Sequence, residues 1–436
     1  MVSGFNFPGR FLRDRRAGIT AFSLVFIAAS LMLGSFGLDV SGLMMARTKL
    51  QVTADATAHS ALVYREQNTA ADSITAALQM AALNMPVATY GTVFSAADIS
   101  FGTYDSTLYS FTPSAGSKTA VKVTTHRQDA GGNAVGTYLF KLVGLDHFDV
   151  VTSAVFVTYQ PKCLREGFVA DGVVDMQSNN NFSNGFCIHS NAHVELNQNN
   201  SFAAGTEVSM PKSGDIIVPG GDLSKNPGLT AALQSKRWNV HVLKRIDQII
   251  AGLNAMNSNY LRSYITAGSI LTLPSNRVSQ SDLVAGNVYA YTCSGGGRLT
   301  LKPGVLVSSV IIVTDCAVMV SNGVAFENAV LATSSTAVDS IKATAGMRIG
   351  RNDNCAVGGG AQIVTAGGVS IPAGLEMYGG QILAKGNVSF AANANGIQGA
   401  SIVSAGVISG TSNMNMAFCG NGMEGNFVAA YFKLAE

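Results

Sequence analysis

The chain has 436 residues, of which 28 are Lys or Arg and 26 are Asp or Glu, so its net charge is +2. This length suggests about three domains, and the near balance of charges argues against a protein that binds nucleic acid through bulk electrostatics. Charged residues make up only 12% of the sequence, whereas hydrophobic residues reach 47% and glycine occurs 47 times. A chain this apolar is not intrinsically disordered. Its composition is typical of an exported β-protein rather than of a cytosolic enzyme.

The N-terminus carries a basic segment followed by a long apolar run. Residues 1–16 form the basic segment, with arginines at four positions: Arg10, Arg13, Arg15 and Arg16. Residues 17–38 contain no charged side chain, and a helix of this length spans the hydrocarbon core of a membrane. Because basic residues stay on the cytoplasmic side, we predict a cytoplasmic N-terminus, with everything after Asp39 on the other side. A cleavable secretion signal is the alternative, but its apolar region is usually only about 7–15 residues long.

The predicted transmembrane helix, residues 17–38, carries large apolar side chains along its whole length. The residues that we expect to contact lipid are Ile19, Phe22, Leu24, Val25, Phe26, Ile27, Leu31, Leu33, Phe36 and Leu38. Residues 39–82 contain no proline and only one glycine, and Pro86 ends the helical pattern. Because an apolar stripe with i+3 and i+4 spacing continues through this region, we predict one helix from Ala17 to about Tyr64, which leaves the membrane as a stalk.

Several short motifs accompany this helix. They are Arg13-Asp14-Arg15-Arg16-x-Gly18, Gly37-x-Asp39, Arg47-x-x-Leu50-Gln51 and Ala54-Asp55-Ala56-x-Ala58. Together with the apolar run, they resemble the N-terminal domain of TadE/TadG-like proteins of tight-adherence (Flp) pilus assembly. TadE-type members carry Glu at the fifth position after the glycine that prepilin peptidases recognise, whereas Ser23 stands there in this chain. The resemblance therefore implies the TadG-like branch, an unprocessed anchor, and a single-pass protein of a bacterial inner membrane whose bulk is periplasmic or extracellular.

Residues 97–159 show the alternation of apolar and polar side chains that is typical of β-strands. The four candidate strands are Ile99–Thr103, Val121–Thr125, Val135–Val143 and Val151–Tyr159. Packing one face of a sheet on the stalk helix is the simplest way to bury these apolar faces. We therefore predict that residues 39–160 form the stalk helix plus a largely antiparallel sheet, a pilin-like α+β domain.

From residue 161 onward, short apolar triplets alternate with Gly, Asn and Ser, and a repeat of nineteen residues emerges. The segments related by this offset are 310–314 and 329–333, 362–371 and 381–390, Val330 and Ile349, and Leu383 and Ile402. Layers of one repeat each, stacked about 4.8 Å apart, build a parallel β-solenoid, and the asparagines of residues 179–200 suggest turns with stacked side chains. We predict such a β-solenoid (β-helix-like) domain for residues 161–436, with a helical insertion around 229–262. An antiparallel sandwich is the alternative, but it requires no fixed offset.

The cysteines agree with export. All six lie beyond residue 160, on the side of the membrane that we predict to be oxidising, so we expect disulfides. They are Cys163, Cys187, Cys293, Cys316, Cys355 and Cys419. The first two are 24 residues apart and the next two 23 apart, close to one repeat, so neighbouring layers would bring each pair within bonding distance. The last two form the third pair by elimination.

One cluster has the residue types of a zinc site: Cys187, His189, His193 and Glu195. In one extended strand, however, residues 187 and 195 would lie over ~25 Å apart, and Cys187 is expected in a disulfide, so we predict no metal ion. Asp171 and Asp175 are the only close pair of aspartates in the early repeats. Because the sequence lacks the common hydrolase and nucleotide-binding motifs, we predict no catalytic residues and no cofactor.

The resemblance and the predicted fold lead to one functional hypothesis. We expect a non-catalytic, membrane-anchored component of Tad/Flp pilus assembly or surface adherence that exposes a β-solenoid outside the cytoplasm. Its expected partners are the membrane, other pilus-assembly proteins and a surface glycan, and they do not include nucleic acid. The alternative is an exported β-helix that binds polysaccharide as an adhesin, or cleaves it as a lyase or hydrolase, and that merely carries this anchor.

Overall fold

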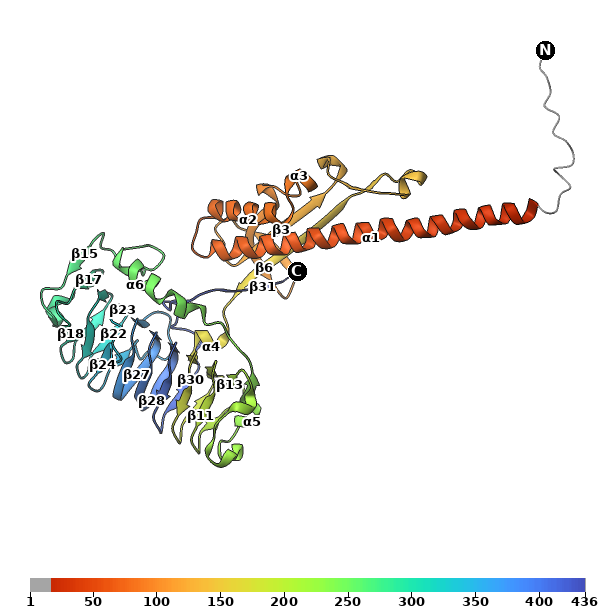
Figure 1. Ribbon diagram of the computed structural model, residues 1–436. Helices are drawn as coiled ribbons and strands as arrows, with labels where there is room; N and C mark the ends of the chain where they lie inside the picture. Colours follow the sequence, from red (N-terminus) through yellow and green to blue (C-terminus); the bar gives the residue numbers. More distant parts are fainter. Residues whose placement is uncertain (1–16, 436) are drawn as a thin grey trace, which may run out of the picture. The chain divides into compact units, whose positions relative to one another are not determined.

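The computed structural model describes residues 17–435, which fall into two compact units (Figure 1). The first unit contains the described residues up to Tyr159 and those from Ala430 onward, and the second is Gln160–Ala429. The second unit is therefore an insertion between two segments of the first. The sequence had placed residues 161–436 in one domain, but the last residues return to the first unit.

The first unit combines helices with a five-stranded antiparallel sheet in the order β2-β1-β3-β6-β31. Its elements are α1 (Ala17–Arg65), α2 (Ala70–Asn84), α3 (Val87–Tyr90), β1 (Ile99–Asp105), β2 (Ser110–Pro113), β3 (Ala120–Arg127), β4 (Val135–Gly136), β5 (His147–Phe148), β6 (Val150–Tyr159) and β31 (Tyr431–Leu434). The predicted single helix is confirmed. Its C-terminal half buries the predicted stripe, including Leu50, Ala54 and Ala61, against apolar residues of β3 and β6.

The predicted strand over residues 135–143 is wrong. Only Val135–Gly136 is extended, and it pairs with β5 in a separate two-stranded hairpin. Phe140–Val143 forms a 3-10 turn, η3. The physical reason is that the backbone N–H groups of residues 138–140 donate to the carboxylate of Asp39 on α1, so they are not available to a β-ladder.

The second unit consists mainly of short strands in one 24-stranded sheet, which we call the parallel stack. Its strands are β7 (Gly167–Ala170), β8 (Val174–Met176), β9 (Asn181–Ser183), β10 (Cys187–Ser190), β11 (Val194–Leu196), β12 (Ser201–Phe202), β13 (Glu207–Met210), β14 (Leu233–Ser235), β15 (Ile270–Thr272), β16 (Arg277–Val278), β17 (Val288–Tyr291), β18 (Arg298–Leu301), β19 (Leu306–Ser308), β20 (Ile311–Thr314), β21 (Ala317–Val320), β22 (Ala325–Glu327), β23 (Ala329–Thr333), β24 (Ile341–Ala343), β25 (Arg348–Ile349), β26 (Ala361–Thr365), β27 (Val369–Ala384), β28 (Val388–Ser404), β29 (Ile408–Gly410) and β30 (Asn415–Ala417). Three short helices accompany them: α4 (Lys162–Arg165), α5 (Leu229–Ala232) and α6 (Ile246–Asn254).

Each strand of the parallel stack pairs in parallel with the corresponding strand of the next layer. β20, for example, lies between β17 and β23, while β21 lies between β18 and β24. The predicted nineteen-residue repeat is confirmed at two places: Ile311 pairs with Val330, and Gln362 pairs with Gln381. Two other assignments are wrong, because insertions shift the register: Val330 pairs with Gln362 rather than aligning with Ile349, and Ile402 pairs with Ile382.

The order of the layers differs from the order of the chain. β7, in the first layer, pairs with β10 on one side and with β28, near the C-terminal end, on the other. The first and last layers are thus neighbours within the stack, and residues 236–269 connect its two far ends, β14 and β15. Figure 1 shows β27 and β28 between β15 at one end and β13 at the other. The helix predicted around 229–262 is shorter, since α6 covers only Ile246–Asn254.

Buried asparagines hold neighbouring turns of the stack together. The side-chain oxygen of Asn226 accepts the N–H of Asn200, that of Asn200 accepts the N–H of Asn180, and that of Asn180 accepts the N–H of Met414. All three asparagines are buried, so each bond satisfies a backbone group that water cannot reach. The predicted stacking of asparagines is confirmed. The bond between Met414 and Asn180 also connects the last layer of the stack to the first.

We predict that the first unit folds without its insertion. Tyr159 and Tyr431 are direct partners across β6 and β31, which is the geometry that a two-residue hairpin loop closes. Replacing residues 160–430 by Asn-Gly should therefore give a chain that unfolds cooperatively in circular dichroism. A matched chain that stops at Tyr159 lacks β31 and should unfold at lower temperature. An excised chain without a cooperative transition would contradict this prediction.

Candidate functional sites

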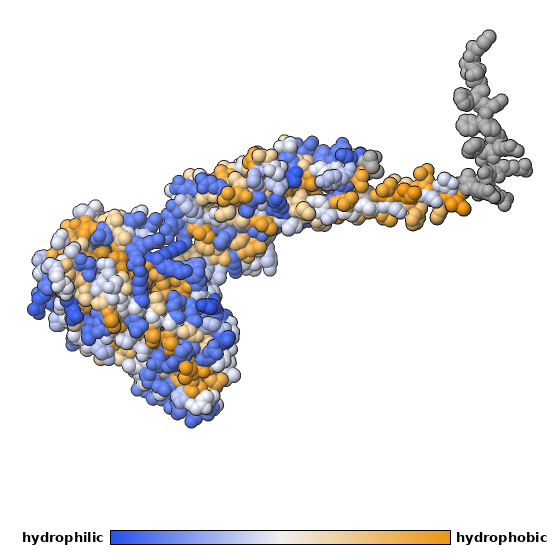
Figure 2. All heavy atoms as spheres, in the orientation of Figure 1, coloured by the Kyte–Doolittle hydropathy of each residue, from blue (hydrophilic) through white to orange (hydrophobic). Residues whose placement is uncertain are grey.

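The large apolar side chains that precede Asp39 on α1 are exposed in the structure. All ten side chains predicted to contact lipid are exposed, from Ile27 at 56% to Leu33 at 76%. Figure 2 shows this part of the helix as a hydrophobic surface. Among the described residues, α1 is the one helix long and apolar enough to cross a membrane, by length and composition. The four arginines that would set its orientation lie outside the described residues.

A buried carboxylate marks the end of this apolar run. Asp39 is only 3% exposed, and its two oxygens accept the backbone N–H groups of Tyr138 at 2.6 Å, Leu139 at 3.0 Å and Phe140 at 2.7 Å. Three charge-assisted bonds to consecutive amides hold η3 firmly against α1. The rings of Phe36 and Phe140 also lie together, with centroids 5.9 Å apart. The sequence analysis missed this contact, although an acid directly after an apolar run was a visible signal.

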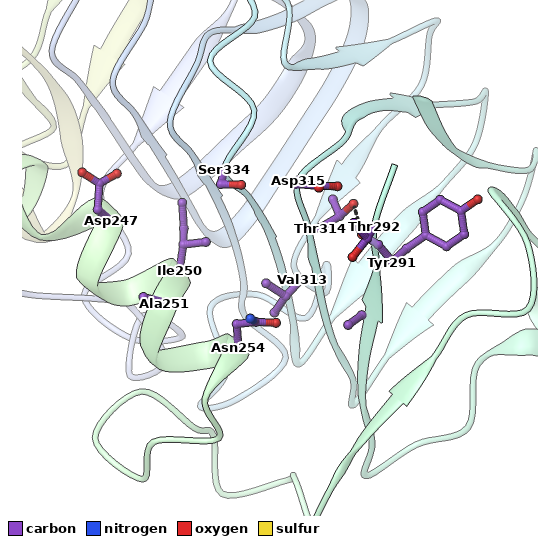
Figure 3. Close-up of a pocket in the computed structure, with 11 residues that line it drawn as sticks. Asp247, Ile250, Ala251, Asn254, Tyr291, Thr292, Val313, Thr314, Asp315 and Ser334 are labelled. Atoms are coloured by element: carbon purple, nitrogen blue, oxygen red, sulfur yellow. Dashed lines mark hydrogen bonds between the residues drawn. The ribbon is translucent and has the colours of Figure 1, made fainter. Parts of the chain in front are cut away.

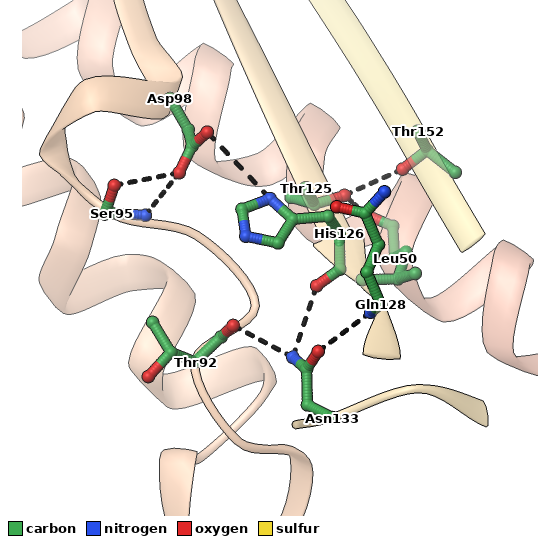
Figure 4. Close-up of polar contacts among 9 residues, drawn as sticks. All are labelled: Leu50, Thr92, Ser95, Asp98, Thr125, His126, Gln128, Asn133 and Thr152. Carbon is green, nitrogen blue, oxygen red and sulfur yellow. Dashed lines mark hydrogen bonds and ion pairs between the residues drawn. The ribbon is translucent and has the colours of Figure 1, made fainter. Parts of the chain in front are cut away.

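A polar network fixes the stalk half of α1 to the sheet (Figure 4). The hydroxyl of Thr125 on β3 donates to the carbonyl of Leu50 on α1 and bonds Thr152 on β6. Nearby, the side chain of Asn133 donates to the carbonyls of Thr92 and His126. Because these groups are largely buried, the bonds specify one position of the helix on the sheet.

All six cysteines are joined in the three predicted pairs. The bonds are Cys163–Cys187, Cys293–Cys316 and Cys355–Cys419, with Cα separations of 5.0, 5.4 and 5.7 Å. Beside the first and third of these bonds, the buried carboxylate of Glu166 accepts the N–H groups of Cys419 and Gly420. These contacts fasten the beginning of the insertion to its end.

The residues of the candidate zinc cluster do not converge. Cys187 is in a disulfide. His189 is buried and bonded to Ser209 through Nδ1 and to Asn191 through Nε2. His193 and Glu195 bond each other at 2.8 Å. They lie at β11, whereas Cys187 and His189 lie on β10. Each candidate ligand is thus engaged in a contact within or between layers.

The two aspartates of the early repeats also separate. Asp171 accepts a bond from Asn191, whereas Asp175 on β8 lies directly beside Glu195 on β11 in the parallel register. Burial, and secondarily the charge of Glu195, raise the pKa of Asp175 above its ordinary value. Asp175 and Glu195 thus place two acidic side chains next to each other on adjacent strands.

A cavity of about 370 Å³ lies between α6 and the parallel stack (Figure 3). Asp247, Ile250 and Asn254 of α6 face Thr314 and Asp315 across it. The polar groups here have partners: the hydroxyl of Thr314 donates to a backbone carbonyl, and a carboxylate oxygen of Asp315 accepts the N–H of Cys293. This cavity therefore presents mostly satisfied groups.

A second cavity, of about 340 Å³, is lined in part by Arg262. The Nε and Nη2 atoms of Arg262 are buried and have no hydrogen-bond partner among residues 17–435, while the guanidinium stacks 3.9 Å from the ring centroid of Phe427. Burial lowers the pKa of Arg262 to about 10. The hydroxyl of Tyr264 is likewise buried without a partner in the described chain, and burial raises its pKa.

Comparisons with known proteins assign two parts of the chain. Residues 167–420 match the family model described as Domain of unknown function (DUF7867). Residues 17–73 match the model described as Putative Flp pilus-assembly TadE/G-like, which confirms the resemblance found in the sequence; the TadG-like branch stays a prediction. No curated protein and no solved structure matches the chain.

We predict that Asp175→Asn stabilises the protein at neutral pH. A raised pKa means that ionised Asp175 costs stability above its folded pKa, and that the cost disappears below the ordinary value near 4. The variant should gain about 0.5 kcal/mol at pH 7, typical of relieving like charges on adjacent strands, and nothing at about pH 3. Urea unfolding at both pH values measures this. The exposed Asp215→Asn is the control, and a less stable Asp175→Asn at pH 7 would refute the prediction.

Proposed function

Because the chain belongs to the family described as Domain of unknown function (DUF7867) and begins with a TadE/G-like segment, we propose that it is a membrane-anchored, non-catalytic component of pilus assembly or surface adherence. The observation that carries this proposal is the two-part character of α1. Its first part is exposed and apolar throughout, whereas its second part is buried against the sheet of the first unit. One rigid helix would thus connect the membrane to a folded domain.

We further propose that the parallel stack is a β-solenoid displayed outside the cytoplasm. Parallel pairing between equivalent strands of successive layers supports this architecture. The three disulfides support an oxidising compartment, since such bonds persist in the periplasm and outside the cell and are rare in the cytosol. Engagement of His189, His193 and Asp171 in structural contacts supports a non-catalytic role.

Deleting the gene and counting surface pili tests this function. We expect deletion to remove most pili and the full chain to restore them. The excised chain, with Asn-Gly in place of residues 160–430, should restore pili but not adherence, because the TadE/G-like segment lies wholly in the first unit. Unchanged piliation after deletion would exclude the assembly role. Adherence by the excised chain would show that the insertion is not needed for adherence.

The cavity at Arg262 favours a second candidate function, binding of an acidic polysaccharide. A buried guanidinium with no acidic partner in the described chain is costly, and a ligand carboxylate would neutralise it through charge-assisted bonds. The one acidic residue lining the cavity, Glu424, accepts the N–H of Gly422 instead. Tyr264 would supply a further hydrogen bond to a sugar hydroxyl.

We predict that Arg262→Gln weakens binding of polygalacturonate at least tenfold, the effect of losing about 1.5 kcal/mol from a charged hydrogen bond. Titration calorimetry with the full chain measures it, and neutral dextran serves as the ligand control. Arg298→Gln removes an exposed arginine from β18 and should change nothing. Equal affinities for Arg262→Gln and the unaltered chain would exclude this site, and release of shorter oligosaccharides would indicate a lyase or hydrolase instead.

A further inference from the structure

The hairpin that carries η3 has an unusual sequence for an exposed turn. We call residues 137–146 the boundary hairpin. Its apolar residues are Tyr138, Leu139, Phe140, Leu142, Val143 and Leu145. Tyr138 is 72% exposed and Leu145 51% exposed. Large apolar side chains that are exposed on a surface loop, as those of Tyr138 and Leu145 are, mark an interaction site rather than a folding requirement.

The position of the boundary hairpin indicates what it contacts. Asp39 holds its backbone at the point where the apolar run ends. Phe140 touches Phe36, which belongs to that run, and Phe148 from the other side of the hairpin. Figure 1 shows the hairpin reaching along α1 towards the N-terminal half of the helix. Its apolar surface is therefore continuous with the surface that α1 exposes to lipid.

We propose that the boundary hairpin inserts into the lipid bilayer beside α1, at the level of the headgroups and upper acyl chains. This inference rests on the proposed membrane anchoring of α1. Tyr138 would occupy the interface, where amphipathic aromatic rings are favoured, and the exposed Lys141 would extend its ammonium group to the headgroups. The acidic residues facing the hairpin are Asp39, which is satisfied by three amides, and the exposed Asp146 at its base.

A second point of membrane contact would change what the anchor does. A single helix can rotate about its own axis and tilt. The boundary hairpin, held on one side of α1 by Asp39, would allow only the rotation that places this side against the bilayer surface. In this proposal Asp39 is a positioning residue: it fixes the hairpin rather than touching lipid itself.

Site-specific fluorescence tests the proposal with the full chain in phosphatidylcholine–phosphatidylglycerol nanodiscs. Because all six native cysteines are in disulfides, one introduced cysteine takes the environment-sensitive dye NBD selectively. The three positions are Tyr138→Cys in the hairpin, Leu31→Cys in the apolar run, and Leu108→Cys. Leu108 lies between β1 and β2 and is also 72% exposed, so it is a matched control.

We expect nitroxide-labelled lipids to quench the dye at positions 138 and 31 at least threefold more strongly than at position 108. Adding Asp39→Ala should lower quenching at position 138 at least twofold and leave position 31 unchanged. Quenching at 31 without quenching at 138 would overturn the hairpin proposal and keep the anchor. Blue-shifted emission at 138 without lipid quenching would assign the hairpin to a protein partner. Absence of quenching at 31 would overturn both proposals.

Discussion

The parallel pairing of β7 with β28 is the contact on which the rest of this architecture depends. It joins the first layer of the parallel stack to the last, residue for residue from Gly167–Ser401 to Ala170–Ser404. Without it and the neighbouring pairings of β8 with β29 and β9 with β30, the stack would consist of two separate pieces, each with an exposed strand edge of the kind that promotes aggregation. With it, the chain enters and leaves the insertion at the same place. This proximity allows a domain of this size to interrupt the sheet of the first unit between β6 and β31.

Periodic features of the fold could be predicted from the sequence, because they are local. The helix from Ala17 to Arg65 follows from composition and spacing, and β1, β3 and β6 follow from alternation. The nineteen-residue repeat is visible wherever two layers carry no insertion, as at Ile311 and Val330. A repeat indicates that layers stack, but it contains no information on which layer ends beside which. The joining of first and last layers, and the return of four residues as β31, therefore could not be predicted.

The candidate sites also differ in whether the local sequence reveals them. Cysteine spacing predicted the disulfides because each of the first two pairs spans about one layer, so stacking alone brings the partners together. The hydrogen bonds of Asp39 involve backbone groups about a hundred residues away, and no local sequence pattern reveals such a contact. It also explains why the pattern at 135–143 misled: Asp39 takes the amides that a strand would have used. Arg262 was missed because nothing in its neighbourhood along the chain shows that it is buried.

The placement of β31 has a consequence for the order in which this protein acquires its structure. β6 is made early, and its open edge can be covered by β31 only after 271 intervening residues have emerged. Closing so long a loop in an unfolded chain is entropically unfavourable, but a folded insertion delivers both ends to the same spot. Pairing of β31 with β6 therefore depends on folding of the insertion. If the stack fails to form, β6 stays uncovered, and a chain with that edge exposed is the form that proteases and chaperones can recognise.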